Sequence, residues 1–403
     1  MLRNLLSLRN NFSFYAKITG NRRFNVISLS HMFTHVFDMM NLALIPVFTN
    51  EFDLTTMQAG MLSTIFIISS MVASVSSGVL VNKFGDKPIM ITSLLVMGIV
   101  SILTSRVNTY LMLVVDLSLL YFASRLFCPP ALSIISESCD NCKLDRGKTV
   151  GFHVSIVSIG IAFGPIFLGL LMQYYAWRLA YLILAVPVLF SIFPIASMKM
   201  PSPQQETTDE IDVEKSQSSK LSAFRTLGFI LTLAALGFRS IGLQGVSTFM
   251  TTYLTAEKGL STSISSIFYG IGSGVGIIGV ALGGILSDKI GEKRWITLTW
   301  IGGILSLLAF SVSPSVSALA FFFILYSLFN SGSVAPVMSL VAKFTSQNRR
   351  SLGYTLYFFS SSLMSAFSPL ISARIIDMSG IWYIFPFALV MLSVSILLIQ
   401  KAI

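Results

Sequence analysis

The sequence predicts an all-α polytopic membrane protein with twelve transmembrane helices. The chain has 403 residues, of which 54% are hydrophobic and only 11% are charged, and its mean hydropathy is +0.79. Globular chains carry about 25% charged residues, so less than half of the usual charge is available to face water. The apolar runs are also much longer than the roughly ten-residue alternating segments of a membrane β-barrel.

Each predicted helix is an apolar run of about 20 residues, the length that crosses the hydrocarbon core. A helix suits this setting because it satisfies its backbone groups internally. The first six helices are predicted over residues 24–48, 56–82, 88–105, 110–136, 149–173 and 177–198. The next six are predicted over residues 223–256, 262–287, 293–312, 316–341, 351–376 and 382–401.

Polar segments divide the chain into an N-terminal bundle over residues 24–198 and a C-terminal bundle over residues 223–403. Residues 1–23 form a basic leader, predicted to be cytoplasmic, without the sustained apolar core of a cleavable signal peptide. The arginines and serines of this leader, and its lack of acids, also fit a short organelle transit sequence. Residues 199–222 contain two prolines and five acids, which predicts a flexible cytoplasmic linker.

The basic residues predict the orientation of the helices. With the N-terminus inside, 21 of the 27 Lys and Arg fall in inner segments, four fall in outer loops and two lie in mid-helix. This bias follows the positive-inside rule, so both termini are predicted to be cytoplasmic, in a prokaryotic-type inner membrane. The rule also explains the net charge of +10 without a nucleic-acid partner. The predicted partners are the lipid bilayer and a small-molecule substrate, and the predicted state is a monomer.

Two stretches of the chain repeat each other at a constant offset of 206 residues. Residues 78–87 read GVLVNKFGDK, and residues 284–293 read GILSDKIGEK. This repeated loop resembles the signature loop of the major facilitator superfamily. The resemblance implies two six-helix bundles, a substrate site near the membrane midplane and alternating access by rocking of one bundle against the other.

The loop is also predicted to act as a gate. Glycine permits a tight turn and a close approach of helices, and the acids and bases can pair across the seam of the bundles and latch one state. Asn82 stands where the family usually has aspartate, so the first latch lacks one charge. The predicted gating residues are Gly78, Asn82, Lys83, Gly85, Gly284, Asp288, Lys289, Gly291 and Lys293.

Ionisable side chains inside the predicted spans are the candidate functional residues, because their burial in a membrane is costly. His31, His35 and Asp38 are spaced i, i+4 and i+7, so they share one helix face and are predicted to couple proton movement to transport. Arg125 and Arg239 lie in mid-span, where each can bind an anion or form a structural ion pair with Asp38. The predicted substrate-binding residues are Arg125, Arg239, Asn330, Gln244 and His35.

The resemblance and these charges together predict a secondary transporter for a small organic solute, anionic or zwitterionic, driven by a proton gradient without a cofactor. Segments around Ser30–Asp38, Phe52–Gly60 and Phe238–Arg239 are similar to fosmidomycin-resistance-type exporters. Organic-anion importers of the superfamily share the intramembrane arginines. The GxxxGP pattern from Gly160 to Pro165 resembles a motif of proton-driven antiporters, although small-residue packing explains it equally well.

Three other classes of function remain as alternatives. The first is a proton-driven efflux antiporter for neutral or cationic drugs, and the second is a channel or a non-transporting sensor. The third is a membrane enzyme, against which the sequence has no GxSxG or P-loop motif. We also expect no metal-ligand cluster, since the three histidines lie on two helices and Cys139 and Cys142 form a lone CxxC.

Overall fold

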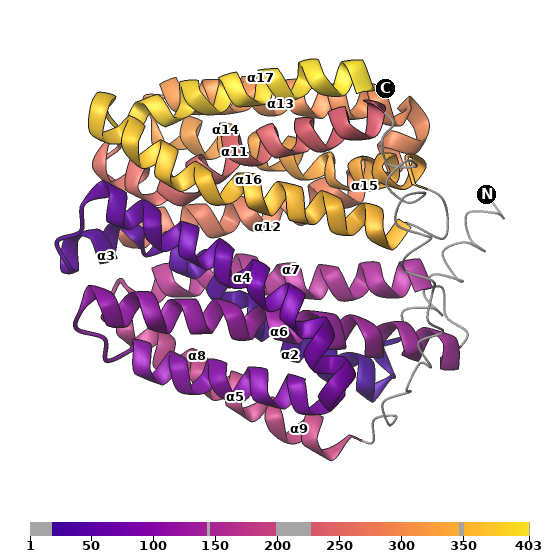
Figure 1. Cartoon of the computed structure of the whole chain (residues 1–403). Coiled ribbons are helices and arrows are strands. Elements are labelled where there is room, and N and C mark those ends of the chain that lie inside the picture. Colours follow the sequence, from indigo (N-terminus) through magenta and orange to yellow (C-terminus); the bar gives the residue numbers. More distant parts are fainter. Residues whose placement is uncertain (1–17, 143–145, 199–226, 346–349, 403) are drawn as a thin grey trace, which may run out of the picture. The chain divides into compact units, whose positions relative to one another are not determined.

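The structure, a computed structural model, describes residues 18–142, 146–198, 227–345 and 350–402 (Figure 1). Residues 1–17 of the predicted leader and the whole predicted linker, residues 199–222, lie outside the described residues. The helices are α2 (Arg22–Ala43), α3 (Ile45–Glu51), α4 (Thr56–Phe84), α5 (Asp86–Thr104), α6 (Tyr110–Cys142), α7 (Arg146–Leu171), α8 (Arg178–Phe190), α9 (Ile192–Ser197), α11 (Leu227–Ala256), α12 (Thr262–Ile290), α13 (Glu292–Val312), α14 (Val316–Gly332), α15 (Val334–Lys343), α16 (Arg350–Ser379), the short 3-10 helix η2 (Ile381–Tyr383) and α17 (Ile384–Ala402).

These helices confirm the predicted class, an all-α protein of membrane-spanning helices. Within the described residues, eleven helical segments are long and apolar enough to cross a membrane, and α2 with α3 supplies a twelfth if the bent pair counts as one span. The bend between α2 and α3 is 56°. Pro46 stands in the first turn of α3, where a missing N–H costs nothing, so the chain begins a new helix there.

Other predicted spans are also interrupted near a proline or a glycine. The sixth span is divided into α8 and α9 after Phe190, close to Pro187 and Pro194. The tenth span is divided into α14 and α15 at Ser333, beside Gly332. Proline removes a backbone donor from a helix interior and glycine lowers helix propensity, which accounts for breaks that an apolar run alone does not reveal.

Helix ends in the two repeated loops are fixed by glycines. Gly85 separates α4 from α5 with φ of 83°, and Gly291 separates α12 from α13 with φ of 94°. Residues with a Cβ rarely adopt such angles. Ser261 begins α12, and its side chain accepts a hydrogen bond from the backbone N–H of Ile264, which satisfies one of the free donors of that helix end.

The helices group into two compact units by their contacts. Unit 1 comprises Met1–Asp38, Val72–Gly164 and Tyr175–Gln205, and unit 2 comprises Met39–Met71, Pro165–Tyr174 and Glu206–Ile403. The boundaries fall inside α4 and α7 and in the last turns of α2. The bundles predicted over residues 24–198 and 223–403 therefore stay a prediction.

In unit 1, α5 packs against α6, α8 and α9. A core of Ala73, Ile89 and Leu126 removes apolar surface between the helices from water. Hydroxyl groups tie the same helices together, since Ser93 Oγ donates to the carbonyl of Ala123 at 2.6 Å. These contacts hold α6, which carries Arg125 and Cys128, in a fixed position within unit 1.

In unit 2, α11 packs against α16 and α17, and α12 packs against α14 (Figure 1). Glycine lets α12 approach α14 closely, because a Cβ added to Gly283 would collide with the backbone carbonyl of Gly332. Ser395 Oγ donates to the carbonyl of Ala235 at 2.7 Å and joins α17 to α11. The core contains Phe229, Ala235, Leu236, Ile296, Trp300, Val337, Leu340, Val341 and Ile399.

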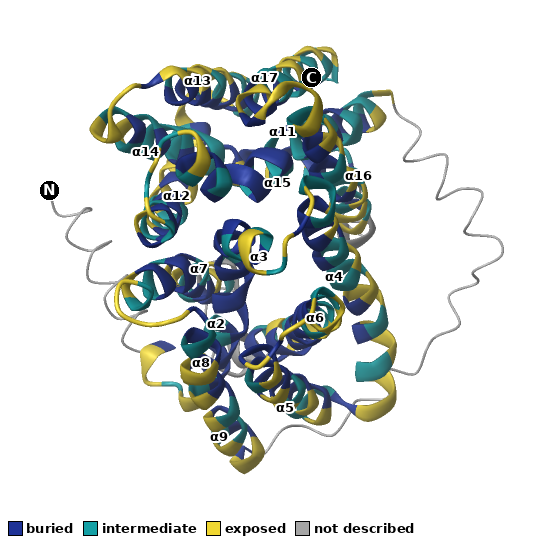
Figure 2. Ribbon diagram, turned by 90° about the vertical axis from the view of Figure 1, so that its left-hand side faces the viewer, coloured by how far each residue is buried: buried dark blue, intermediate teal, exposed yellow. Residues whose placement is uncertain are grey.

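Exposed residues lie along single faces of several helices (Figure 2), and many of them are apolar. On α5 these are Leu95, Ile99 and Leu103, which recur every four residues and are 45–52% exposed, while Leu94 and Met97 of the same helix are buried. Such faces are unfavourable in water and favourable in lipid. The pattern agrees with an integral membrane protein.

Candidate functional site

Asp38 forms the centre of a charged group within unit 1. Its Oδ2 accepts a hydrogen bond from Arg125 Nη2 at 2.8 Å and lies 2.7 Å from His35 Nδ1. The Asp38 residue is only 7% exposed, and the phenol of Tyr121 donates to its backbone carbonyl at 2.7 Å. The sequence left open whether an arginine would pair with Asp38 or bind an anion, and Arg125 makes the ion pair.

The three histidines of the chain lie together, one against the next. His35 Nε2 is 3.2 Å from His31 Nε2, and His31 Nδ1 is 2.8 Å from His153 Nε2. Ser28 Oγ completes the series at 2.8 Å from His153 Nδ1. His31 and His35 share a face of α2 as predicted, and His153 reaches them from α7.

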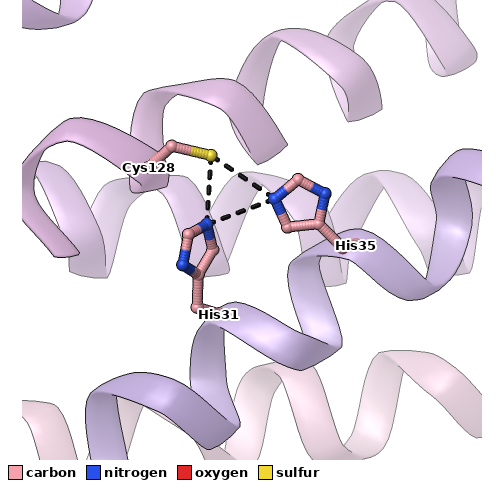
Figure 3. A group of neighbouring side chains, drawn as sticks. All are labelled: His31, His35 and Cys128. Carbon is pink, nitrogen blue, oxygen red and sulfur yellow. Dashed lines mark hydrogen bonds between the residues drawn. The ribbon is translucent and has the colours of Figure 1, made fainter. Parts of the chain in front are cut away.

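Cys128 joins the two histidines of α2, and sequence reasoning missed it. Its Sγ lies 3.1 Å from His31 Nε2 and 3.5 Å from His35 Nε2 (Figure 3). His31, His35 and Cys128 bring three possible metal-ligand atoms within 4.8 Å of one another, a group that the expectation of no metal-ligand cluster did not foresee. Cys128 follows Arg125 at i+3 on α6, and this spacing was the available signal that the two side chains share a helix face, although it does not reveal the contact with α2.

Arg239 on α11 occupies a different environment in unit 2. Its Nη2 donates to the backbone carbonyl of Asn330 at 3.0 Å, to the Asn330 side-chain oxygen and to Ser333 Oγ at 3.2 Å. The guanidinium also lies 5.4 Å from the centre of the Trp300 ring, within the range of a cation–π contact. Among the described residues, no ion pair neutralises Arg239.

A cavity of about 270 Å³ lies in unit 2 beside this arginine. Arg239 itself lines a much smaller void of about 10 Å³, and the two spaces share Leu243, Tyr326 and Asn330 as walls. The cavity walls come from α11, α14 and α16, and all the described residues that line it are uncharged. They are Ser240, Leu243, Gln244, Ser247, Tyr326, Asn330, Ser361, Ser362 and Ser365.

The predicted substrate-binding residues are thus divided between the two units. Arg239, Asn330 and Gln244 lie at or beside the cavity of unit 2, whereas Arg125 and His35 contact Asp38 in unit 1. Sequence reasoning missed the serines of α16. Their signal was the run Ser360–Ser362, which is polar within an otherwise apolar helix.

The glycines that begin the two predicted gating loops stand in open positions. A Cβ at Gly78 would meet nothing within 4 Å, and one at Gly284 would only touch Ala335 at 3.8 Å, so neither glycine marks a close helix contact. An ion pair at the second loop joins Glu292 to Lys343 at 2.7 Å. The gating role of these loops stays a prediction.

Gly160 of the GxxxGP pattern marks a tight helix contact within unit 1. A Cβ at Gly160 would collide with the backbone carbonyl of Met32, so α7 approaches α2 as closely as a glycine allows. This contact sets the distance between the helices that carry His153 and His31. Gly160 therefore allows α7 and α2 to pack closely.

The sequence model of the protein family called the Major Facilitator Superfamily matches residues 27–369 of the chain and, in a second match, residues 282–402. The chain belongs to the major facilitator superfamily. It is accordingly a membrane transporter and not an enzyme. This confirms the family that the repeated loop suggested.

Two curated relatives and one solved structure illustrate the range of the family. The chain is 24% identical over 218 residues to an MFS-type efflux pump of Mycolicibacterium smegmatis, with 52% of this chain and 50% of the pump covered. It is 23% identical over 281 residues to the cis,cis-muconate transport protein of Acinetobacter baylyi, with 66% of each chain covered. These matches thus span about half of the pump and about two thirds of the muconate protein.

The crystal structure of the nucleoside transporter NupG has the same fold. Its TM-score is 0.80 at 13% sequence identity, and the match covers 95% of this chain and 99% of that chain. At this identity the likeness concerns the fold alone.

Proposed function

We propose that this transporter carries small organic anions and that Arg239 holds the charge of the anion. The observation behind the proposal is that the partners of this partly buried guanidinium among the described residues, Asn330, Ser333 and Trp300, are all neutral. An intramembrane cation without a counter-charge is costly. A bound carboxylate or phosphonate supplies that counter-charge and can accept two parallel hydrogen bonds from the guanidinium.

The cavity beside Arg239 supports the same substrate class. Its serines, Gln244 and Asn330 offer hydrogen bonds without charge, and Tyr326 offers an aromatic face. A volume of about 270 Å³ is near the lower end of the range of about 300–1,000 Å³ for small-molecule pockets. This combination suits a compact anion with further polar groups, as in the dicarboxylate that the muconate relative is named for.

The test is uptake of labelled carboxylates and phosphonates into proteoliposomes. Loss of a hydrogen bond to a charged group costs about 1.5–3 kcal/mol, so Arg239→Ala should raise the apparent Kd for the anion by about 10- to 150-fold. Arg374→Ala is the matched control, because Arg374 is an exposed arginine on α16 and its loss should leave uptake unchanged. Unchanged anion uptake by Arg239→Ala would exclude the proposed site.

The driving force stays a prediction from the sequence. Coupling to protons through Asp38, His35 and His31 predicts that anion flux moves protons in the same vesicles, and that Asp38→Asn loses proton-driven accumulation. Full accumulation by that variant would exclude Asp38 as the coupling group. Import and export both stay open, and the resemblance to fosmidomycin-resistance-type exporters and the efflux-pump relative favour export.

Efflux of neutral or cationic drugs is the second candidate function, and the efflux-pump relative favours it. Under that hypothesis Arg239 is a structural residue that holds α11 against α14 through Asn330. A screen of pooled anions against pooled neutral and cationic compounds separates the two candidates. Exchange of labelled for unlabelled solute separates either carrier from a channel or a sensor.

Cytoplasmic termini, a prokaryotic inner membrane and a monomeric state also stay predictions. Cysteine-specific labelling of tags at both ends, in intact and opened cells, tests the termini. The mass of the purified protein in detergent tests the monomer.

A further inference from the structure

Three potential metal ligands point toward one another inside unit 1. They are His31 Nε2 and His35 Nε2 from α2 and Cys128 Sγ from α6 (Figure 3). His31 is 4% exposed and His35 is 6% exposed, whereas Cys128 is half-buried. Two imidazoles and a thiolate form a typical ligand set for thiophilic metals.

We propose that His31, His35 and Cys128 bind one thiophilic metal ion with a filled d shell, Cu⁺ or Zn²⁺. The proposal concerns a second site, separate from the anion site proposed at Arg239, and it does not rest on the transported substrate. It also explains why Cys128 faces the histidines of α2.

The distances fit direct coordination. The three ligand atoms are 3.1, 3.2 and 3.5 Å apart, so the centre of the triangle they form is about 1.9 Å from each atom. A metal ion about 1 Å above that plane is about 2.1 Å from all three, close to the bond lengths of about 2.0–2.1 Å for Zn–N and about 2.3 Å for Zn–S. A pyramidal site of this kind leaves a fourth position open for a weak ligand.

Both histidines are oriented from their far side, as metal-binding histidines usually are. His35 Nδ1 lies 2.7 Å from the Asp38 carboxylate, which has no proton to give when ionised, so the ring donates from Nδ1 and leaves Nε2 with a lone pair. His31 Nδ1 lies 2.8 Å from His153 Nε2. When His31 donates there, its Nε2 also presents a lone pair to the same point.

Ser28 completes the support of this arrangement. Its Oγ is 2.8 Å from His153 Nδ1, so His153 can donate from Nδ1 to Ser28 while it accepts from His31 at Nε2. In the metal-free protein the same series can run the other way, with His31 donating from Nε2 to His35. Metal binding therefore shifts the proton of His31 from Nε2 to Nδ1 as the series reverses, so both imidazoles stay neutral. The thiol proton of Cys128 leaves to solvent as the metal–sulfur bond forms.

The charges around the cluster favour Cu⁺ over Zn²⁺. Arg125 neutralises Asp38 through the 2.8 Å ion pair, so neither contributes net charge to the site. Cu⁺ bound by one thiolate and two neutral imidazoles carries no net charge, whereas Zn²⁺ carries a charge of +1 with the same ligands. Because uncompensated charge is costly inside a membrane, the Cu⁺ complex is the more stable of the two in this place.

The bound ion would tie α2 to α6 at the position of the Asp38–Arg125 ion pair. Coordination holds the His35 ring, and His35 in turn contacts the Asp38 carboxylate. A bound metal ion therefore restrains the position of the Asp38 carboxylate in addition to the ion pair with Arg125. Asp38 is the residue that the sequence predicts to couple proton movement to transport. A metal-free His31, His35 and Cys128 cluster that only passes protons is the competing account.

The test measures binding of Cu⁺, Ag⁺ and Zn²⁺ to the purified full chain in detergent. The background carries Cys139→Ser and Cys142→Ser, which leaves Cys128 as the sole thiol of the chain. Competition with a chromophoric chelator gives the affinity, and elemental analysis after desalting gives the stoichiometry. The expected result is one ion per chain, with Cu⁺ and its redox-stable substitute Ag⁺ bound more tightly than Zn²⁺.

Variants separate a built site from a thiol that binds metal by itself. Adding Cys128→Ser should abolish binding, and adding Ser118→Cys to that variant returns a thiol to α6 without restoring binding. His153→Gln removes the ring that orients His31, and Asp38→Asn removes the carboxylate that orients His35 together with the ion pair to Arg125. Each should weaken binding by about 10- to 100-fold. A single cooperative unfolding transition in metal-free buffer shows that each variant is folded.

Cobalt provides a readout that needs neither tight binding nor transport. Co²⁺ held by Cys128 should give a sulfur-to-cobalt charge-transfer absorption that is absent in Cys128→Ser. The proposal is overturned if the background protein binds less than a tenth of an equivalent of every ion. It is equally overturned if the Ser118→Cys protein binds as tightly as the background, or if His31→Gln and His35→Gln leave the affinity unchanged.

Discussion

The ion pair between Asp38 and Arg125 should make a large and measurable contribution to stability. The oxygen and nitrogen are 2.8 Å apart, and the Asp38 side chain is 9% exposed while that of Arg125 is 30% exposed. At an effective dielectric constant of about 20, unit charges at this distance attract by about 6 kcal/mol. Desolvation of both charges offsets much of that attraction.

The change in the free energy of unfolding follows from what each substitution leaves behind. Removing one partner of a buried pair typically costs about 3–5 kcal/mol, and the partial exposure of Arg125 reduces this to about 2–3 kcal/mol. Asp38→Asn leaves a guanidinium without its carboxylate, and Arg125→Gln leaves a carboxylate whose remaining side-chain partner is His35. The double variant leaves neither charge, so its cost should fall short of the sum of the single costs by about 2 kcal/mol.

The assay is unfolding in mixed micelles with increasing SDS, followed by tryptophan fluorescence. A matched cycle on Glu292 and Lys343 serves as the control, because that pair approaches to 2.7 Å, close to the 2.8 Å of Asp38 and Arg125, but the Lys343 side chain is 66% exposed. Exposed pairs contribute less than about 1 kcal/mol. A coupling free energy for Asp38 and Arg125 within about 0.5 kcal/mol of zero would refute the reasoning.

Three further predictions follow from local geometry. Gly85→Ala should destabilise the protein by about 1–3 kcal/mol, because Gly85 has φ of 83° and ψ of 163°. Gly78→Ala is its control in the same unfolding assay. It should be neutral or stabilising, because Gly78 lies inside a helix with open space around its Cα. Gly60→Val should lower the unfolding temperature and transport, since an added Cβ would lie 2.8 Å from the carbonyl oxygen of Pro369. Asn330→Ala removes a side-chain acceptor of the partly buried guanidinium in unit 2 and should lower anion uptake with little loss of protein in the membrane; wild-type uptake would contradict it.

Much of the fold could be predicted because the membrane imposes simple rules. A helix in lipid must be long and apolar and must satisfy its own backbone, and the described helices follow the predicted runs. The breaks beside Pro46 and Gly332 were not predicted, because a bent helix and a straight one have the same hydropathy. Likewise the boundaries of the two compact units depend on contacts between distant residues.

The candidate sites were predicted only in part, because sequence spacing is informative within a helix and silent between helices. The shared face of His31, His35 and Asp38 follows from the 3.6-residue period. Their meeting with Cys128 depends on how α6 packs against α2, and nothing local encodes it. The sequence also could not show which arginine pairs with Asp38, because Arg125 and Arg239 both lie in the middle of apolar helices.

The central claim is that Arg239 supplies the positive charge that selects an organic anion. The most direct test is the affinity of the purified transporter for a carboxylate and for its neutral amide of nearly the same size. The account predicts that the wild-type protein prefers the carboxylate by at least about tenfold and that Arg239→Ala removes this preference. Equal affinity for both compounds in the wild type, or an unchanged preference in Arg239→Ala, would contradict it.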